Sequence, residues 1–290
     1  MIAAGASVAT ALRVATAMLA GPEARSEAEI LIAHALSWPR TRLFAHADDC
    51  LDAEQATRCQ TLLAARQHGQ PIAYLLGERE FYSLRLRVTP AVLIPRHETE
   101  LLVDWALAVC PDRAGGYRLL DLGTGSGAIA LALASARPQA EVWAVDASAA
   151  ALAIAADNAQ RLGLDHVHFC LSDWFSALPS ALRFDLIAAN PPYVAAADPH
   201  LDQGDLRFEP AQALTPGGDG LSAIRAITAS AAAFLRPGGH LLLEHGHDQG
   251  SAVRELLQVA DYADIDTRRD GAGHERVTSA TRPDLGVVNH

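Results

Sequence analysis

Residues 121–127 read Asp-Leu-Gly-Thr-Gly-Ser-Gly and stand between an apolar run and an alanine-rich run. Glycines at such a strand–helix junction allow a tight turn and close approach of the backbone to a nucleotide-like ligand. Asp146 ends the next apolar run, about 20 residues further on, where a carboxylate can accept hydrogen bonds from both hydroxyls of a ribose. The segment therefore predicts a turn that binds a nucleotide cofactor, in preference to glycines that serve packing alone.

The glycine segment leaves two classes of cofactor open. Because Ala128 follows it, the segment also satisfies the looser G-x-G-x-x-G/A pattern of dinucleotide sites. Asp121, however, lies two residues before the first glycine. A carboxylate there is unfavourable beside a pyrophosphate but can attract the ammonium group of a methionine moiety. This position favours S-adenosyl-L-methionine, with S-adenosyl-L-homocysteine as product, over a dinucleotide.

A third candidate element, Ser172 to Trp174, follows the third expected strand. The adenine edge would lie there if Asp146 held the ribose. Asp173 can accept a hydrogen bond from the adenine amino group, and Trp174 offers an apolar or stacking wall. The structural alternative is a turn aspartate and a core tryptophan, but their position after the strand favours the cofactor interpretation.

Asn190-Pro191-Pro192-Tyr193 ends the fourth expected strand, at the edge where open α/β sheets bind ligands. An amide nitrogen is a poor nucleophile, and acceptors that hold both of its N–H groups can orient it. The side-chain oxygen of Asn190 and the backbone carbonyl of Pro191 can be those acceptors, preset by the stiff prolines. Tyr193 can pack against the planar group. Instead of a plain proline turn, the motif predicts methylation of a planar amide or amino nitrogen by proximity and orientation, with no strong base.

The chain after residue 116 alternates strands with helices, which predicts a parallel sheet covered on both faces. Ile265 and Val277 are the apolar centres of two further expected strands. The expected helices are residues 98–109, 126–135 and 148–162, and the expected strands are residues 118–121, 141–146, 167–171, 185–189 and 240–244.

The first 80 residues read as a small helical bundle. Ser26 to Glu29 forms an S/T-x-x-E pattern that predicts a capping box opening the apolar stretch up to Leu36, and another helix is expected from Asp52. Leu84, Leu86 and Val88 then alternate with arginines, which predicts a strand or hairpin connecting two domains. The expected domains are a helical substrate-recognition domain (1–80), a β-hairpin linker (81–95) and a methyltransferase domain (96–290).

The amino-acid composition limits the classes of partner and the compartment that are expected. The 23 basic against 34 acidic side chains give a net charge of −11, which disfavours a protein whose task is to grip phosphate backbones. The four cysteines contain no C-x-x-C pair and read as reduced thiols in a cytoplasmic protein. The apolar N-terminus lacks a preceding basic segment and is interrupted by Arg13, so an amphipathic helix is favoured over a signal peptide. No run reaches the length of a membrane span, and no metal site is expected.

The sequence resembles the protein-(glutamine-N5) methyltransferases that modify peptide chain release factors. The resemblance runs from about Gln70 to Val277. Its matching segments, in family order, are residues 70–74, 93–96, 99–100, 121–130, 173–175, 190–193, 207–210 and 243–246. The family implies a helical N-terminal domain, a β-hairpin linker and a seven-stranded, Rossmann-like class I methyltransferase domain. This sequence departs from the family pattern at His97-Glu98, where many relatives have Pro-Asp or Pro-Glu.

The resemblance implies methyl transfer from S-adenosyl-L-methionine to the glutamine of the Gly-Gly-Gln loop in class I release factors, which modulates translation termination. The implied glutamine-site residues are Asn190, Pro191, Pro192 and Tyr193, with Asn190, Pro191 and Tyr193 taken as catalytic. The implied and expected cofactor residues are Asp121, Gly123, Thr124, Gly125, Ser126, Gly127, Asp146, Asp173, Trp174 and Asn190. A monomer that binds neither nucleic acid nor membrane is expected.

Several alternatives stay open at this point. Methylation of exocyclic amino groups in DNA or RNA would use the same acceptor geometry on a flipped base, but the net charge counts against it. A donor-binding protein without transfer activity is disfavoured by the intact tetrapeptide. Arg207 and Glu209 either pair to shape a loop over the active site or contact the substrate. His245 and His247 are expected to be loop histidines and not metal ligands, and His97 has no assigned role.

Overall fold

The computed structural model describes residues 1–19 and 21–284, which divide into two compact units, residues 1–78 and 79–290. The first unit is helical. Its helices are α1 (Val8–Met18), α2 (Ala24–Leu36), α3 (Arg40–Ala45), α4 (Ala53–Gln67) and α5 (Ile72–Leu76). Helix α2 contacts both α1 and α4, and the fully buried side chains of Leu31, Ile32, Leu43 and Leu63 lie in their common core.

Two helix starts in this unit show what the sequence patterns can and cannot fix. Asp52 caps α4 as expected: its side chain accepts from Gln55 N at 2.7 Å while the Gln55 side chain accepts from Asp52 N at 3.0 Å. The capping box predicted at Ser26 is wrong. Helix α2 begins earlier, at Ala24, because Ala24 and Ala28 are buried in the core, and this packing extends the helix beyond the polar signal.

A hairpin follows, as predicted, but it spans residues 78–87 and so starts before the expected linker of residues 81–95, at the last residue of the first unit. Strands β1 (Glu78–Phe81) and β2 (Leu84–Arg87) form a two-stranded sheet, and both turn residues, Tyr82 and Ser83, have positive φ. Leu86 is buried while the arginines on either side are exposed, as the alternation predicted. A 3₁₀ turn η1 (His97–Thr99) then leads into α6 (Glu100–Val109).

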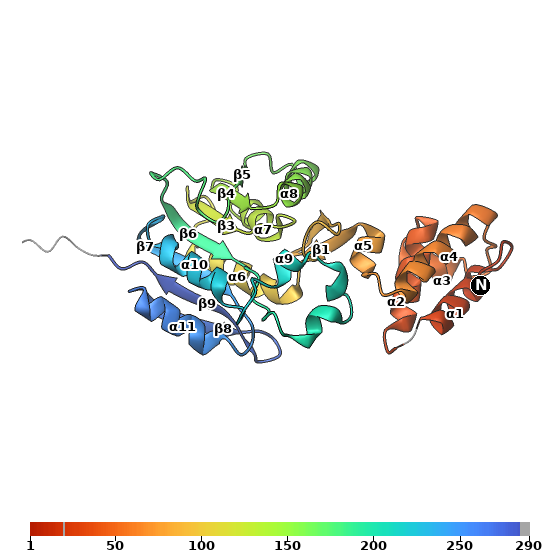
Figure 1. Cartoon of the computed structure of the whole chain (residues 1–290). Coiled ribbons are helices and arrows are strands. Elements are labelled where there is room, and N and C mark those ends of the chain that lie inside the picture. Colours follow the sequence, from red (N-terminus) through yellow and green to blue (C-terminus); the bar gives the residue numbers. More distant parts are fainter. Residues whose placement is uncertain (20, 285–290) are drawn as a thin grey trace, which may run out of the picture. The chain divides into compact units, whose positions relative to one another are not determined.

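Seven strands form the main sheet in the order β5-β4-β3-β6-β7-β9-β8 (Figure 1). The strands are β3 (Arg118–Leu122), β4 (Glu141–Asp146), β5 (His168–Leu171), β6 (Phe184–Ala189), β7 (Leu235–Glu244), β8 (Ala263–Arg269) and β9 (Glu275–Thr281). The first five are parallel, and β9 runs antiparallel to both of its neighbours. The expected strands at Ile265 and Val277 are therefore confirmed. Strand β7 starts five residues before the predicted His240 because its backbone continues through Gly238, which has positive φ.

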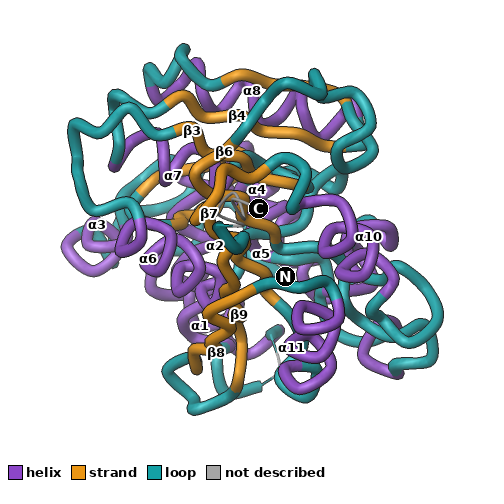
Figure 2. Tube along the Cα trace, turned by 90° about the vertical axis from the view of Figure 1, so that its left-hand side faces the viewer, coloured by secondary structure: helices purple, strands orange, loops and turns teal. Residues whose placement is uncertain are grey.

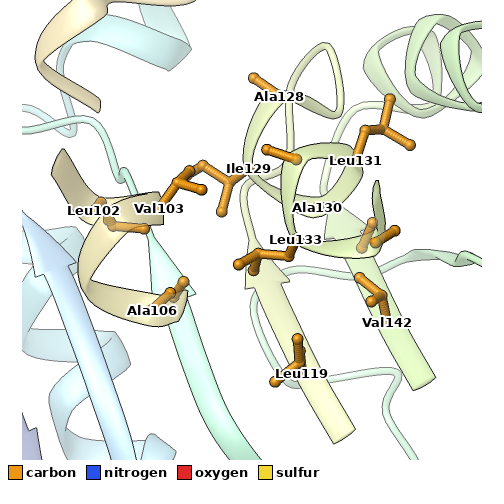
Figure 3. Packing of buried hydrophobic residues seen from close by; sticks show 14 of the residues in the cluster. Leu102, Val103, Ala106, Leu119, Ala128, Ile129, Ala130, Leu131, Leu133 and Val142 are labelled. Carbon is orange, nitrogen blue, oxygen red and sulfur yellow. The ribbon is translucent and has the colours of Figure 1, made fainter. Parts of the chain in front are cut away.

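Helices cover both faces of this sheet, because successive strand residues point to opposite sides. Leu119 and Leu186 face the helices α6, α7 (Ala128–Ala136) and α8 (Ala149–Leu162). Figure 3 shows the α6 and α7 part of this packing. Leu120 and Ile187 face α10 (Ser222–Ala231) and α11 (Gly250–Val259), which lie to one side of the strands in Figure 2. The remaining short elements are η2 (Pro199–Asp202), η3 (Leu206–Phe208) and α9 (Ala211–Leu214).

Strand register brings four loops to one edge of the sheet. Leu122 is paired with Val145 on one side and Ala189 on the other, and Asp146 is paired with Leu171. The chain therefore leaves β3, β4, β5 and β6 at nearly the same level. The glycine loop, Ser172 to Trp174 and Asn190 to Tyr193 follow β3, β5 and β6, and Asp146 is the last residue of β4.

Candidate active site

A cavity of about 410 Å³ opens at this edge of the sheet. Its walls come from the loops that follow β3, β4, β5 and β6, closed by residues 91–93 and by the segment around α9. A smaller cavity of about 50 Å³ adjoins it and shares Leu93, Gly123, Gly125 and Asn190. A volume of this size suits a cofactor-sized ligand, with room beside it for a smaller reacting group.

The glycine loop between β3 and α7 has a backbone conformation that requires glycine. Gly123, Gly125 and Gly127 all have positive φ, a conformation that side chains disfavour. At Gly127 a Cβ atom would also stand 2.9 Å from Leu131 Cδ1 and 3.2 Å from the Cβ of Ala155. The third glycine is therefore required both by its backbone angle and by the close packing of α7 and α8.

Asp146 joins the glycine loop to the end of β4. Its Oδ2 accepts a hydrogen bond from Gly125 N at 2.9 Å, and its Oδ1 accepts from Ser148 N at 2.8 Å. Each carboxylate oxygen has a second lone pair, and Asp146 lines the larger cavity. The carboxylate is thus fixed by two backbone donors while it still offers acceptor capacity to a ligand.

Asp121 lies beneath the loop and lines neither cavity. Its side chain is fully buried, and Oδ2 accepts from the Thr124 hydroxyl at 2.6 Å and from Ala130 N at 3.1 Å. Its Oδ1 is buried without a hydrogen-bond partner among the described residues. Burial raises the pKa of Asp121 to about 7, although the bond from Thr124 opposes this rise. Oδ1 is therefore a buried acceptor whose hydrogen-bonding capacity the described residues do not use.

Ser172, Asp173 and Trp174 line the larger cavity from the end of β5. Trp174 has a positive φ, stabilised by the Ser172 hydroxyl, which donates to the Trp174 carbonyl at 2.8 Å and accepts from Ala177 N at 3.0 Å. The Trp174 ring lies against the glycine loop, 3.6 Å from where a Cβ of Gly123 would stand. Asp173 is exposed at the rim.

Asn190 occupies the point where the two cavities meet. Its Nδ2 donates to the hydroxyl oxygen of Thr99 at 3.1 Å, and no hydrogen bond from the described residues reaches its Oδ1. Pro192 also lines the larger cavity, whereas Pro191 is buried and lines neither. The amide of Asn190 is therefore anchored by its nitrogen side, which leaves the oxygen available as an acceptor.

Tyr193 lies behind the wall and not in it. Its hydroxyl donates to Glu244 Oε1 at 3.2 Å, and its backbone carbonyl accepts from Gln249 Nε2 at 2.9 Å. Burial raises the pKa of the Tyr193 hydroxyl, and the nearby negative charge of Glu244 adds to this rise. The ring lines neither cavity.

The loop that carries Arg207 to Pro210 contributes one wall residue, Pro210. The pairing considered between Arg207 and Glu209 is wrong. The Glu209 carboxylate instead accepts hydrogen bonds from the guanidinium of Arg96 and, at 3.1 Å, from Ile94 N. Burial raises the pKa of Glu209, and the positive charge of Arg96 opposes this rise. This buried ion pair ties the loop to the segment before η1.

The three histidines considered in the sequence, His97, His245 and His247, differ in their surroundings. His97 is exposed and lies 3.2 Å from Glu100 Oε2. His245 lies in the loop after β7, as expected, but is fully buried there, and its ring bonds Thr278 Oγ1 at 2.8 Å and the Gly246 carbonyl at 2.9 Å. The ring of His247 lies 5.5 Å from that of His274. Within the part of the chain that the structure describes, no cluster of three side chains is arranged to hold a metal ion.

Sequence reasoning missed several residues that shape this site. Leu93, Ala151 and Gln212 line the larger cavity. Asn158 lines no cavity, but it holds the glycine loop by donating to the Ser126 carbonyl at 2.9 Å and accepting from Arg87 N at 2.6 Å. Thr99 and Glu244 stood in segments quoted for the resemblance, yet nothing in the sequence alone indicated that they bond Asn190 and Tyr193.

Comparisons with known proteins agree with this geometry. Residues 114–267 match the family described as Methyltransferase domain, and residues 10–77 match the PrmC N-terminal domain. The release factor glutamine methyltransferase of Burkholderia pseudomallei is 51% identical over 270 residues, which cover 91% of this chain and 94% of that protein. That of Xylella fastidiosa is 54% identical over 259 residues, covering 89% and 94%.

The fold is shared more widely. The Thermus thermophilus 16S rRNA N2 G1207 methyltransferase, solved with AdoMet and guanosine, is similar with a TM-score of 0.54 and 22% identity, over 71% of this chain and 49% of that one. At this identity the likeness shows the fold alone. The identity to the bacterial relatives is far higher and extends over nearly the whole length of each protein. The chain belongs to the family of release factor glutamine methyltransferases.

Proposed function

We propose that this protein transfers the methyl group of S-adenosyl-L-methionine to the side-chain amide nitrogen (N5) of the glutamine in the Gly-Gly-Gln motif of class I peptide chain release factors. S-adenosyl-L-homocysteine is the second product, and the modification modulates translation termination. The observation that carries this proposal is Asn190, whose amide is anchored through Nδ2 where the two cavities meet, while no hydrogen bond from the described residues reaches its Oδ1.

The larger cavity fits the donor in its chemistry. Asp146 would hold the ribose hydroxyls, and Asp173 and Trp174 would bind the adenine. Asp121 lies beneath the glycine loop and lines neither cavity, so its buried, unpartnered Oδ1 would act on the ammonium group of a methionine moiety through its charge and not through a contact in the cavity wall. Among the remaining proposed contacts, Gly123 to Ser126 line the two cavities and would bring backbone close to the ligand, whereas Gly127 lines neither and would act through the shape of the loop. Asn190 lines both cavities and would contact donor and glutamine alike.

When bound, S-adenosyl-L-methionine supplies an electrophilic methyl group on a positively charged sulfur. The chain supplies orientation. Asn190 Oδ1 and the Pro191 carbonyl would accept the two N–H groups of the substrate amide, which turns the nitrogen lone pair toward the donor. Stiffness comes from Pro191 and Pro192, together with the bond from Tyr193 to Glu244. Because a methylated amide nitrogen is strongly acidic, its proton leaves to water without a dedicated base.

Charge supports a protein substrate over the runner-up, methylation of a nucleic-acid amino group. The net charge of −11 repels a phosphate backbone, whereas a basic protein would be attracted. We further propose a monomeric cytoplasmic enzyme without direct contact to nucleic acid or membrane. Among the described residues, no helix combines the length and apolar character that a membrane crossing requires.

We also propose that residues 1–80 recognise the release factor, residues 81–95 act as linker and residues 96–290 catalyse the transfer. A cavity of about 640 Å³ within the first unit supports this role. Trp38 and Leu62 give it an apolar wall, and Arg58 adds charge at its edge. An open pocket with an aromatic anchor is typical of a protein-binding surface.

The decisive test is mass spectrometry of a purified class I release factor after incubation with enzyme and donor. A mass gain of one methylene group on the Gly-Gly-Gln peptide is expected, and none when the motif glutamine is replaced by alanine. Methylation of RNA or DNA in a parallel assay, with an unmodified release factor, would support the runner-up instead.

A further inference from the structure

A buried chain of polar groups runs from β7 to the reactive tetrapeptide. Glu244, the last residue of β7, is only 1% exposed. The Tyr193 hydroxyl donates to its Oε1, and the Thr99 side chain acts on it as a hydrogen-bonding group that lowers its pKa. Thr99 in turn accepts the bond from Asn190 Nδ2. One carboxylate is thus linked to both polar side chains of the tetrapeptide.

The direction of these hydrogen bonds follows from the chemistry of the groups. An ionised carboxylate can only accept. Facing it, the Thr99 hydroxyl must donate, and its oxygen is then left to accept. The only part of the Asn190 amide that can donate to this oxygen is Nδ2, so Oδ1 must turn away from Thr99 and toward the cavity. The charge at Glu244 therefore selects one of the two orientations of the Asn190 amide.

We propose that Glu244 and Thr99 are positioning residues, whose hydrogen-bond polarity holds the Asn190 amide with its oxygen toward the substrate. The catalytic consequence rests on the proposed function, whereas the orientation itself does not. Replacing Glu244 by glutamine would reverse the polarity. The glutamine oxygen would accept from Tyr193, its amide would donate to Thr99, and the Thr99 hydroxyl would then donate to a flipped Asn190 Oδ1.

Protonation of Glu244 should have the same effect as this substitution. The charged and titratable groups that act on Glu244 are Arg276 of β9, Glu98 of η1 and the hydroxyl of Tyr193. Oε2 of Glu244 has no hydrogen-bond partner among the described residues, and Arg276 is itself paired with Asp270 at 3.2 Å. Burial accordingly raises the pKa of Glu244 to about 7, despite the opposing influence of Thr99 and Arg276.

NMR tests the orientation without a substrate. Diffraction seldom distinguishes the oxygen and nitrogen of an amide, but the chain has only three asparagines, so selective ¹⁵N-asparagine labelling gives three side-chain amide signals. Asn158, which is fully buried and bonded to backbone groups, is the internal reference. The Asn190 signals should titrate with a midpoint near pH 7 in the unaltered protein and lose this titration in Glu244→Gln.

Two outcomes would overturn the proposal. One is a constant Asn190 signal across this pH range in the unaltered protein. The other is a titration that persists in Glu244→Gln, because it would belong to Asp121, whose pKa is also raised to about 7. The Asn158 signals report whether the variant is folded.

Kinetics with a release factor then separate positioning from a merely structural role. Glu244→Gln and Thr99→Val should lower kcat by roughly tenfold or more, with the KM for the donor changed by less than about twofold. Thr99→Ser keeps the hydroxyl and should restore most of the rate. Equal losses in Thr99→Ser and Thr99→Val, or a loss confined to donor KM, would contradict the proposal. An unaltered enzyme that methylates no release factor would refute the proposed function and leave the NMR result standing.

Discussion

The carboxylate of Asp146, at the end of β4, accepts a hydrogen bond at 2.9 Å from the backbone N–H of Gly125 in the loop after β3. It accepts a second at 2.8 Å from Ser148 N at the start of α8. One side chain therefore connects the glycine loop, the second strand of the sheet and the next helix. The residue proposed to bind the ribose also sets the shape of the loop proposed to surround the donor.

This double role predicts a large effect of Asp146→Ala on donor binding. Both backbone donors lose their acceptor and the ribose hydroxyls lose theirs, so the Kd for S-adenosyl-L-methionine should rise by roughly tenfold to a hundredfold. Isothermal titration calorimetry measures this. Asp173→Ala is the matched control, because Asp173 lines the same cavity but is exposed. Similar losses in both variants would contradict the dual role of Asp146.

Asn190→Ala should abolish turnover while largely sparing donor affinity. The substitution removes the acceptor that orients the substrate amide, and loss of one such group in a preorganised site costs on the order of a hundredfold in kcat. The Kd for S-adenosyl-L-homocysteine, measured in the absence of a release factor, should change by less than about threefold. Comparable losses of rate and of cofactor affinity would show that Asn190 acts mainly in cofactor binding.

Gly127→Ala should destabilise the methyltransferase unit more than Gly163→Ala. Both glycines have positive φ, so both variants carry the backbone cost of about 1 kcal/mol. A Cβ at Gly163 meets open space, whereas one at Gly127 stands 2.9 Å from Leu131 Cδ1. We expect an additional loss of about 1–3 kcal/mol for Gly127→Ala. Chemical denaturation of the two variants measures the difference, and equal stabilities would refute the packing argument.

Asp121→Asn should stabilise the protein at pH 8 and weaken donor binding. Burial raises the pKa of Asp121 from the ordinary carboxylic range to about 7, so between about pH 4 and 7 the folded chain holds a proton that the unfolded chain has released. Its contribution to the free energy of unfolding therefore falls as the pH rises through this window, by roughly 4 kcal/mol for a shift of this size. An asparagine oxygen can keep the bonds from Thr124 and Ala130 without the charge.

Thermal denaturation at pH 5 and pH 8 checks this sign. The gain from Asp121→Asn should be present at pH 8 and nearly absent at pH 5, where the aspartate is protonated. A loss of stability at pH 8 would mean that the buried charge is compensated in solution. Donor affinity should fall in the variant at pH 8 because the ammonium group loses its counter-charge.

Trp38→Ala should raise the KM for an intact release factor but not for a short Gly-Gly-Gln peptide. Trp38 lines the cavity of the helical unit, and aromatic anchors carry much of the energy of protein interfaces. Phe44→Ala is the control, since Phe44 is a large exposed aromatic side chain that does not line this cavity. A rise in KM for both substrates, or for both variants, would argue against a recognition surface at Trp38.

The sequence by itself determined the order of the elements and the chemical type of the site. Strand and helix periods are local properties, so β4 was predicted to the residue and α6 to within two residues. The glycine loop and Asn190–Tyr193 carry their chemistry in residue types at fixed spacing. The predicted first residues of α2 and β7 were too late in the chain. Buried alanines extend α2, and a glycine with positive φ lets β7 begin earlier than the local signals indicate.

Only the tertiary structure decided which of these residues line the cavity and which support them from behind. Asp121 and Tyr193 lie behind the cavity wall, while Leu93 and Pro210, distant in sequence, line it together. The bond from Asn190 to Thr99 and the bond from Tyr193 to Glu244 join three segments that no periodicity relates. Sequence patterns record the preferences of neighbouring residues. The contacts of a buried polar group depend on strand order and register, which are fixed only when the sheet and its covering helices pack together.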